Sequence, residues 1–157
     1  MSILWILDTD HLSLFQNSHP LVTQRIRQQN PENLAITVIT FEEKVKGWLN
    51  VINKYNNQPS KYDKLIWGYK GLWDEIEYFK NIKLLEFDTK ACNIYAELVK
   101  YKIRVGTQDL RIAAITLSVN GILVTRNRKD FEKVPNLRLE DWTYNLDNAY
   151  PDFDDLF

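Results

Sequence analysis

The side chains best suited to chemistry in this sequence lie at four separate places: Asp8, Glu43, Asp109 and Asn127. Each follows an apolar, strand-like segment or lies in the early part of a predicted helix. In an α/β sheet those positions face one crevice, where ligands usually bind. Carboxylates gathered there repel one another unless a hard cation joins them. The sequence therefore predicts a magnesium or manganese site on a small α/β domain.

The elements that must position these side chains follow from apolar runs and helical spacing. The predicted strands cover residues 3–7, 34–37, 82–87, 122–125 and 137–139. The predicted helices cover residues 11–16, 20–29, 40–55, 61–80, 89–104 and 107–120. This order predicts a three-layer α/β/α sandwich with a mostly parallel central sheet of four to five strands.

Local signals refine three of the helices. The segment Asp8-Thr9-Asp10 offers an N-cap for the first of them. Thr40 is predicted to cap the third, with Glu43 completing a capping box, and Thr107 to cap the last. The long helix at 61–80 carries an apolar stripe, and Trp67 and Tyr78 lie off that stripe. A helix that is apolar on two sides is expected to be buried in the core or in an interface such as a dimer. The stripe consists of Ile66, Tyr69, Trp73, Ile76 and Phe79.

Composition sets the broad class. The chain has 157 residues, 45% of them hydrophobic, and a net charge of −1, so it predicts one packed domain at residues 1–145. Residues 146–157 form an acidic C-terminal tail. The lone Cys92 cannot form an internal disulfide, which fits a cytoplasmic protein, and its helical context predicts burial. No apolar run approaches the ~20 residues of a membrane span.

The four polar segments together resemble the PIN-domain ribonucleases, and within them the VapC-like toxins of prokaryotic toxin–antitoxin pairs. The resemblance covers roughly residues 3–142. Any one motif would be weak, but four occur in the right order. The matching segments are residues 6–10, 36–47, 106–114 and 123–131, followed by a family-like ending at 134–142.

The resemblance implies a PIN-like fold in which Asp8, Glu43 and Asp109 bind Mg²⁺ (or Mn²⁺). The family's fourth position usually holds an acid two residues after a threonine, and Asn127 stands there in this chain. Asp130 is the alternative for that position. The implied activity is hydrolysis of RNA phosphodiester bonds by a metal-activated water. No His/Cys set has zinc spacing.

Two further assignments remain open at the level of sequence. Glu42 competes with Glu43 for the metal, although the spacing to Gly47 favours Glu43. His11 and His19 are expected at surface or capping positions rather than as ligands.

The resemblance also implies partners: an RNA substrate, for which transfer RNA is a common target in the family, a cognate antitoxin and a second copy of the chain in a homodimer. No membrane partner is expected. Basic residues near the third and fourth motifs could contact RNA phosphates, or they could form an ordinary solvated surface. They are Arg104, Arg111, Arg126, Arg128 and Lys129.

Two other functions fit part of the pattern. A haloacid-dehalogenase-like phosphatase would use Asp8 as nucleophile in an Asp-x-Asp motif, but the Gly-Thr expected after Asp10 is missing, because His11 and Leu12 follow. A PIN-like module that lost catalysis through Asn127 would only bind RNA or a partner. Trapping of an aspartyl-phosphate and magnesium-dependent RNA cleavage distinguish these functions.

Overall fold

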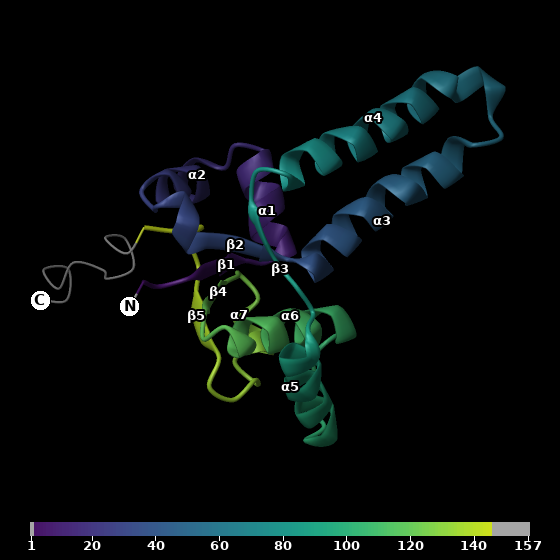
Figure 1. The fold of residues 1–157 in the computed structure, drawn as a ribbon. Coiled ribbons are helices and arrows are strands. Elements are labelled where there is room, and N and C mark those ends of the chain that lie inside the picture. The colour runs from purple at the N-terminus through teal and green to yellow at the C-terminus, as the bar shows by residue number, and fades with distance from the viewer. Residues whose placement is uncertain (1, 146–157) are drawn as a thin grey trace, which may run out of the picture.

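The computed structural model describes residues 2–145, which fold around a five-stranded sheet (Figure 1). Every strand pair is parallel, and the strand order is β3-β2-β1-β4-β5. The strands are β1 (Trp5–Leu7), β2 (Leu34–Thr37), β3 (Lys83–Leu85), β4 (Ile122–Val124) and β5 (Arg138–Glu140). All five predicted strands are present, so the expected parallel sheet is confirmed. The predicted acidic tail, 146–157, lies outside the described residues.

Seven α-helices connect and flank these strands within the described residues. They are α1 (Thr9–Gln16), α2 (Pro20–Arg27), α3 (Val38–Tyr55), α4 (Tyr62–Phe79), α5 (Thr89–Lys100), α6 (Thr107–Ser118) and α7 (Arg128–Phe131). Short 3₁₀ turns, η1 (Pro31–Asn33) and η2 (Pro59–Lys61), precede β2 and α4. The sequence did not predict α7. It predicted Thr107 as the N-cap of α6, but the N-cap is Gly106 and Thr107 is the first helical residue.

Two hydrophobic clusters cover the two faces of the sheet, because neighbouring residues of a strand point to opposite sides. Ile6 and Leu123 pack in one cluster with residues of α5, α6 and α7. Leu7 and Val124 pack in the other with residues of α1, α2 and the end of α4. Figure 1 shows α1 and α2 on one side of the sheet and α5, α6 and α7 on the other. The predicted three-layer sandwich is therefore confirmed.

The helices α3 and α4 form a hairpin that projects from the body of the domain (Figure 1). The face of α4 turned to α3 carries small residues. A Cβ on Gly71 would lie 2.3 Å from the Trp48 ring, so only glycine permits this close approach. Gly68, Gly71, Glu75 and Phe79 are the buried residues of α4.

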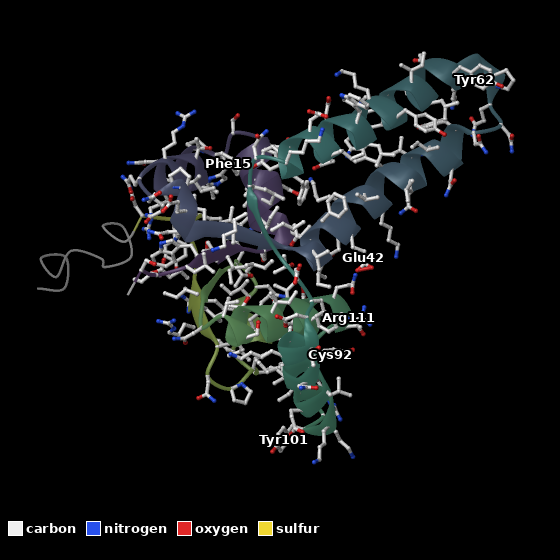
Figure 2. All side chains as sticks on the ribbon, viewed as in Figure 1. Phe15, Glu42, Tyr62, Cys92, Tyr101 and Arg111 are labelled. Carbon is white, nitrogen blue, oxygen red and sulfur yellow. The ribbon has the colours of Figure 1, made fainter. Side chains whose placement is uncertain are left out.

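Most residues of the apolar stripe on α4 do not lie in the domain core, so their predicted burial there is wrong. Ile66 and Trp73 are 70% and 65% exposed, and Tyr69 and Ile76 are also exposed, whereas Phe79 is buried. The reason is that Gly68, Gly71 and Glu75 form the buried face of α4 against α3. The four other members of the stripe do not belong to that face and stay exposed. Tyr62 is exposed at the tip of the hairpin (Figure 2).

Two smaller findings complete the description. Cys92 is a free, exposed cysteine on α5 (Figure 2), so its predicted burial is wrong: it lies on the outer side of an amphipathic helix. Within residues 2–145, none of the helices combines the length and the apolar character required to cross a membrane.

Candidate metal centre

One pocket, of about 350 Å³, brings together side chains from four of the helices and from the loop after β4. All four site residues named from the sequence, Asp8, Glu43, Asp109 and Asn127, line it. The other lining residues are Thr9, Asp10, Ser13 and Phe131. The pocket lies at the carboxyl ends of β1, β2 and β4, where the chain changes direction across the sheet and where α/β folds bind ligands.

Asp8 follows β1 directly and is also the N-cap of α1. Its Oδ1 accepts the backbone N–H of His11 at 2.7 Å, and its own N–H donates to the carbonyl of Val124 in β4. The carboxylate is 90% buried. No hydrogen bond reaches Oδ2 from residues 2–145, so one oxygen serves the helix and the other is available to a ligand. Capping and metal binding are therefore compatible roles.

Glu43 enters the pocket from the second turn of α3. The predicted capping box is wrong: Thr37 is the N-cap of α3, and its hydroxyl accepts the N–H of Thr40 at 3.2 Å. The buried Thr40 hydroxyl instead lies 3.0 Å from that of Thr9, and Thr9 donates to Oε1 of Glu43 at 2.9 Å. Because Thr9 donates to Glu43, Thr40 is the donor to Thr9. This chain of hydroxyls orients the carboxylate and engages only one of its oxygens.

Glu42, the rival of Glu43, is exposed and does not line the pocket. Its Oε1 accepts from the side-chain amide of Gln108 at 2.7 Å. The structure thus brings Glu43, and not Glu42, to the other acidic residues.

Asp109 lies in the first turn of α6, and its carboxylate accepts no hydrogen bond from the described residues. Burial raises the pKa of Asp109 to about 6, and the negative charges of Glu43, Asp8 and Asp130 add to the effect. An acid whose ionisation is opposed by neighbouring carboxylates is a group that a cation would stabilise. The raised pKa of Asp109 therefore indicates that the pocket is a site of negative charge.

Asn127 follows β4, where its backbone N–H donates to the hydroxyl of Thr125 at 2.9 Å. Its Nδ2 donates to Oδ2 of Asp130 at 3.1 Å. This hydrogen bond is the main cause of a lowered pKa for Asp130, and Lys133 contributes as well. Asn127 lines the pocket and Asp130 does not, and Asp130 engages the amide nitrogen of Asn127 from outside the pocket.

A second set of groups, Asp8, Asp10 and His11, has ligand atoms that all lie within 4.8 Å of one another. This set is poorly suited to a cation. Both oxygens of Asp10 accept from the guanidinium of Arg126, at 2.7 and 2.8 Å. Nε2 of His11 accepts the backbone N–H of Trp142 at 3.2 Å, which places the imidazole proton on Nδ1. Asp8 is then the one member with an oxygen to offer.

The basic residues predicted to contact RNA have different surroundings. Arg126 is paired with Asp10, which raises its pKa. Arg111 donates to Gln108 and lies 5.4 Å from the centre of the Tyr95 ring. Arg104, Arg128 and Lys129 are exposed. Arg128 lies 3.8 Å from Glu132, and within residues 2–145 no ion pair engages the charged groups of Arg104 and Lys129.

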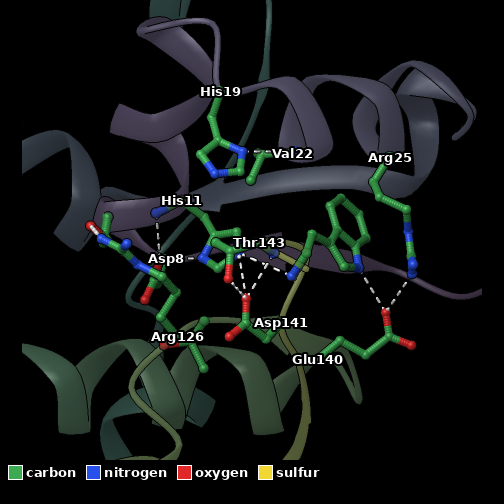
Figure 3. Close-up of polar contacts among 12 residues, drawn as sticks. Asp8, His11, His19, Val22, Arg25, Arg126, Glu140, Asp141 and Thr143 are labelled. Carbon is green, nitrogen blue, oxygen red and sulfur yellow. Dashed lines mark hydrogen bonds and ion pairs between the residues drawn. The ribbon is translucent and has the colours of Figure 1, made fainter. Parts of the chain in front are cut away.

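Sequence reasoning missed His11. The expected surface or capping position is wrong for this residue, which is fully buried, whereas His19 does cap α2 by accepting the N–H of Val22. The spacing of three residues from Asp8 is a local signal for a shared helix face. The contact with Trp142 has no such signal, because the two residues are near opposite ends of the described chain (Figure 3).

With this geometry established, comparison with known proteins is informative. Ribonuclease VapC1 of Haemophilus influenzae strain R2866 is 27% identical over 144 residues, covering 90% of this chain and 99% of the relative. Ribonuclease VapC of Rickettsia bellii is 32% identical over 108 residues, covering 60% and 80%. A tRNA(fMet)-specific endonuclease VapC of Salmonella typhimurium is 35% identical over 69 residues, covering 41% and 52%. No family model matches the sequence.

The solved structure of VapBC-1 from nontypeable Haemophilus influenzae superposes with a TM-score of 0.69 and 25% identity, covering 90% of this chain and all of the matched one. The sequence similarity covers nearly the full described length. It agrees with the all-parallel sheet and with the acidic pocket at the carboxyl edge of that sheet. The chain belongs to the VapC family of PIN-like ribonucleases.

Proposed function

We propose that the protein is a metal-dependent endoribonuclease that hydrolyses RNA phosphodiester bonds in the pocket between Asp8, Glu43 and Asp109, and that it is the toxin of a toxin–antitoxin pair. The observation that carries the proposal is the convergence of three carboxylates from α1, α3 and α6 on one pocket, together with the raised pKa of Asp109. The names of the relatives support the same reaction class.

The donor set fits a hard divalent cation. Asp8 and Glu43 each use one oxygen within the protein, Asp109 uses none, and so all three have an oxygen for Mg²⁺ or Mn²⁺. Such a cation supplies an activated water and neutralises charge on the phosphate. The residues of the chain orient the oxygens: the N–H of His11 fixes Asp8, and Thr9 fixes Glu43.

The direct test is cleavage of a defined RNA by the purified chain with Mg²⁺, with Mn²⁺, and after treatment with a chelator. We expect cleavage with either metal and none in the chelated sample. Metal-independent cleavage would contradict the role of the carboxylates. Absence of cleavage despite metal binding would favour the alternative of a catalytically weakened binding module.

Asn127 should limit the occupancy of a second cation, because it replaces an acid and removes one negative charge. We expect a single occupied metal at low Mg²⁺. Asn127→Asp should raise cleavage about tenfold at limiting metal, a change equivalent to about 1.4 kcal/mol, and should change little at saturation. Cleavage measured against metal concentration tests this.

Asp130→Asn is the matched variant, because it alters the carboxylate that accepts from Asn127 and lies outside the pocket. We expect Asp130→Asn to change cleavage only a few-fold. A strong loss in this variant, with no gain in Asn127→Asp, would mean that Asp130 fills the fourth acidic position.

The exposed stripe on α4 supports a homodimer, since a small protein rarely leaves so many adjacent large apolar side chains in water. Sedimentation at tens of micromolar (an order-of-magnitude range for a weak dimer) should give about twice the 18.6 kDa chain mass. Trp73→Ser should shift the protein toward monomer. Tyr101→Ser, which changes an exposed aromatic residue after α5, is the control (Figure 2). A wild-type monomer would argue against this role for the stripe.

Partners follow from the relatives. The structural neighbour from Haemophilus influenzae is named VapBC-1, which supports a cognate antitoxin for this chain. The tRNA-specific relative makes transfer RNA the first substrate to test. We place the protein in the cytoplasm, where such a substrate occurs. Arg104, Arg128 and Lys129 are the proposed phosphate contacts. Arg111 and Arg126 would require release from their present partners, and Arg128 from its weaker pairing with Glu132.

The phosphatase alternative is not favoured. An Asp-x-Asp phosphatase needs its second aspartate as a proton donor, yet both Asp10 oxygens are held by Arg126. Trapping of an aspartyl-phosphate on Asp8 would revive this alternative.

A further inference from the structure

The segment after β5 lies beside His11 and Asp8 (Figure 3). Its central residue, Trp142, is fully buried, and its indole N–H donates to Glu140 at 2.8 Å. The guanidinium of Arg25 lies 5.4 Å from the centre of the indole ring. The segment is further fixed by Asp141, whose Oδ1 accepts from the N–H and hydroxyl of Thr143. These contacts hold the segment against β5 and α2.

His11 is the residue through which this segment meets the metal centre. Its Nε2 accepts the backbone N–H of Trp142 at 3.2 Å. Asp141 Oδ1 is 3.7 Å from the same nitrogen, which is too long for a hydrogen bond. The backbone N–H of Trp142 already points at Nε2, so a proton bound to Nε2 would clash with that N–H. The surroundings thus select the tautomer with the proton on Nδ1.

The other imidazole nitrogen faces Asp8. Nδ1 lies 3.4 Å from Oδ1 of that carboxylate, but the two groups are not aligned as a hydrogen bond. Within residues 2–145 this buried N–H has no acceptor, and an unmet buried donor costs free energy because it has lost its hydrogen bonds to water. Rotation of the carboxylate toward His11 would remove that cost.

We propose that His11 is a positioning residue for Asp8: with its proton on Nδ1 and its Nε2 fixed by the backbone of Trp142, it holds Oδ1 on the protein side and leaves Oδ2 for the cation. The inference rests on the proposed metal site. It assigns to the segment Asp141–Thr143 the role of a support for a metal ligand. The rival arrangement is direct ligation by Nδ1, together with Asp8 and Asp10.

The tautomer can be read directly, because the chain has only two histidines. Nitrogen-15 spectra of metal-free protein labelled at histidine should show one imidazole protonated at Nδ1 and not at Nε2. The variant His19→Asn lacks the signals of His19, so the signals that remain belong to His11. The pattern should persist after addition of Mg²⁺. A proton on Nε2, or loss of the Nδ1 proton when Mg²⁺ is added, would overturn the proposal.

Two substitutions separate the two nitrogens. In His11→Asn the amide nitrogen can take the place of Nδ1 beside Asp8, and the contact with Trp142 is lost. In His11→Gln the amide oxygen can take the place of Nε2 and accept from Trp142, and the donor to Asp8 is lost. A purely structural role predicts that metal affinity follows stability in both variants.

Calorimetric titration with Mn²⁺, with thermal unfolding of the same samples, gives both quantities. We expect His11→Gln to bind Mn²⁺ about 10–100-fold more weakly than wild type, in the range found for residues that support metal ligands. His11→Asn should stay within a few-fold of wild type while unfolding at a lower temperature. Equal Mn²⁺ affinity in His11→Gln and wild type would overturn the proposal. A wild type that binds no metal would instead refute the proposed function, and the tautomer spectrum would still decide the inference.

Discussion

Asp8→Asn is expected to reduce RNA cleavage about a thousandfold and to leave the fold intact. A thousandfold loss corresponds to about 4 kcal/mol, which is the scale on which a metal-activated water and charge neutralisation contribute. The structure explains why stability should survive. Asparagine is as good an N-cap as aspartate, and its carbonyl can still accept the N–H of His11. The measurement is initial cleavage rate at saturating Mg²⁺, with thermal unfolding of the same protein.

A matched control exists elsewhere in the chain. Asp88 caps α5 as Asp8 caps α1, and its carboxylate accepts the N–H of Ala91 at 2.9 Å. It does not line the pocket. Asp88→Asn should therefore cleave RNA at the wild-type rate. If both substitutions lowered activity to the same degree, loss of negative charge at a helix N-cap would be the cause and Asp8 would not be a metal ligand.

Asp109→Asn should weaken metal binding about a hundredfold and stabilise the metal-free protein at neutral pH. The pKa of Asp109 is raised from 3.8 to about 6 in the folded state, first by burial and then by Glu43 and Asp8. A raised carboxyl pKa means that ionisation opposes folding. Below about pH 4 the carboxyl is protonated in the folded and the unfolded state, and it does not change the free energy of unfolding. Above about pH 6 it is ionised in both states, and the destabilisation of the folded state is complete. The half-exposed position reduces that cost to about 1 kcal/mol.

The variant should therefore match wild type near pH 4 and gain stability as pH rises to 6 and beyond. Urea unfolding of metal-free protein at pH 4, 5, 6 and 7 measures this. Addition of Mg²⁺ should reverse the order at pH 7, because wild type gains binding energy that the variant lacks. A stability difference independent of pH, or unchanged metal affinity by calorimetry, would show that Asp109 does not share a site with Glu43 and Asp8.

Sequence information was sufficient where function and fold depend on local signals. Apolar runs located every strand, and the polar residues at strand ends located the pocket, because parallel strands deliver their carboxyl ends to one edge. The glycine at position 47 pointed to Glu43 over Glu42, and the structure brings Glu43 to the pocket.

What the sequence did not reveal depends on contacts between distant residues. Thr40 resembled a cap, yet Thr37 took that role at the end of β2 and released Thr40 to bond with Thr9. The stripe on α4 had the spacing of a core face, but Gly71 allowed the opposite face to pack on Trp48. The pairing of Asp10 with Arg126 and of His11 with Trp142 joins segments more than a hundred residues apart, for which periodicity carries no information.

The strand order has a consequence for the cell that makes this nuclease. The central strand β1 is synthesised first, but Ile6 pairs with Leu123 of β4, which is translated much later. Until β4 leaves the ribosome, Asp8 lacks its backbone partner Val124, and Asn127 does not yet exist in the chain. Domains fold as units during synthesis, so the pocket assembles only when nearly the whole domain has emerged. A growing chain that has passed Asp109 but lacks β4 thus carries all three acidic residues of the site without the strand that positions Asp8.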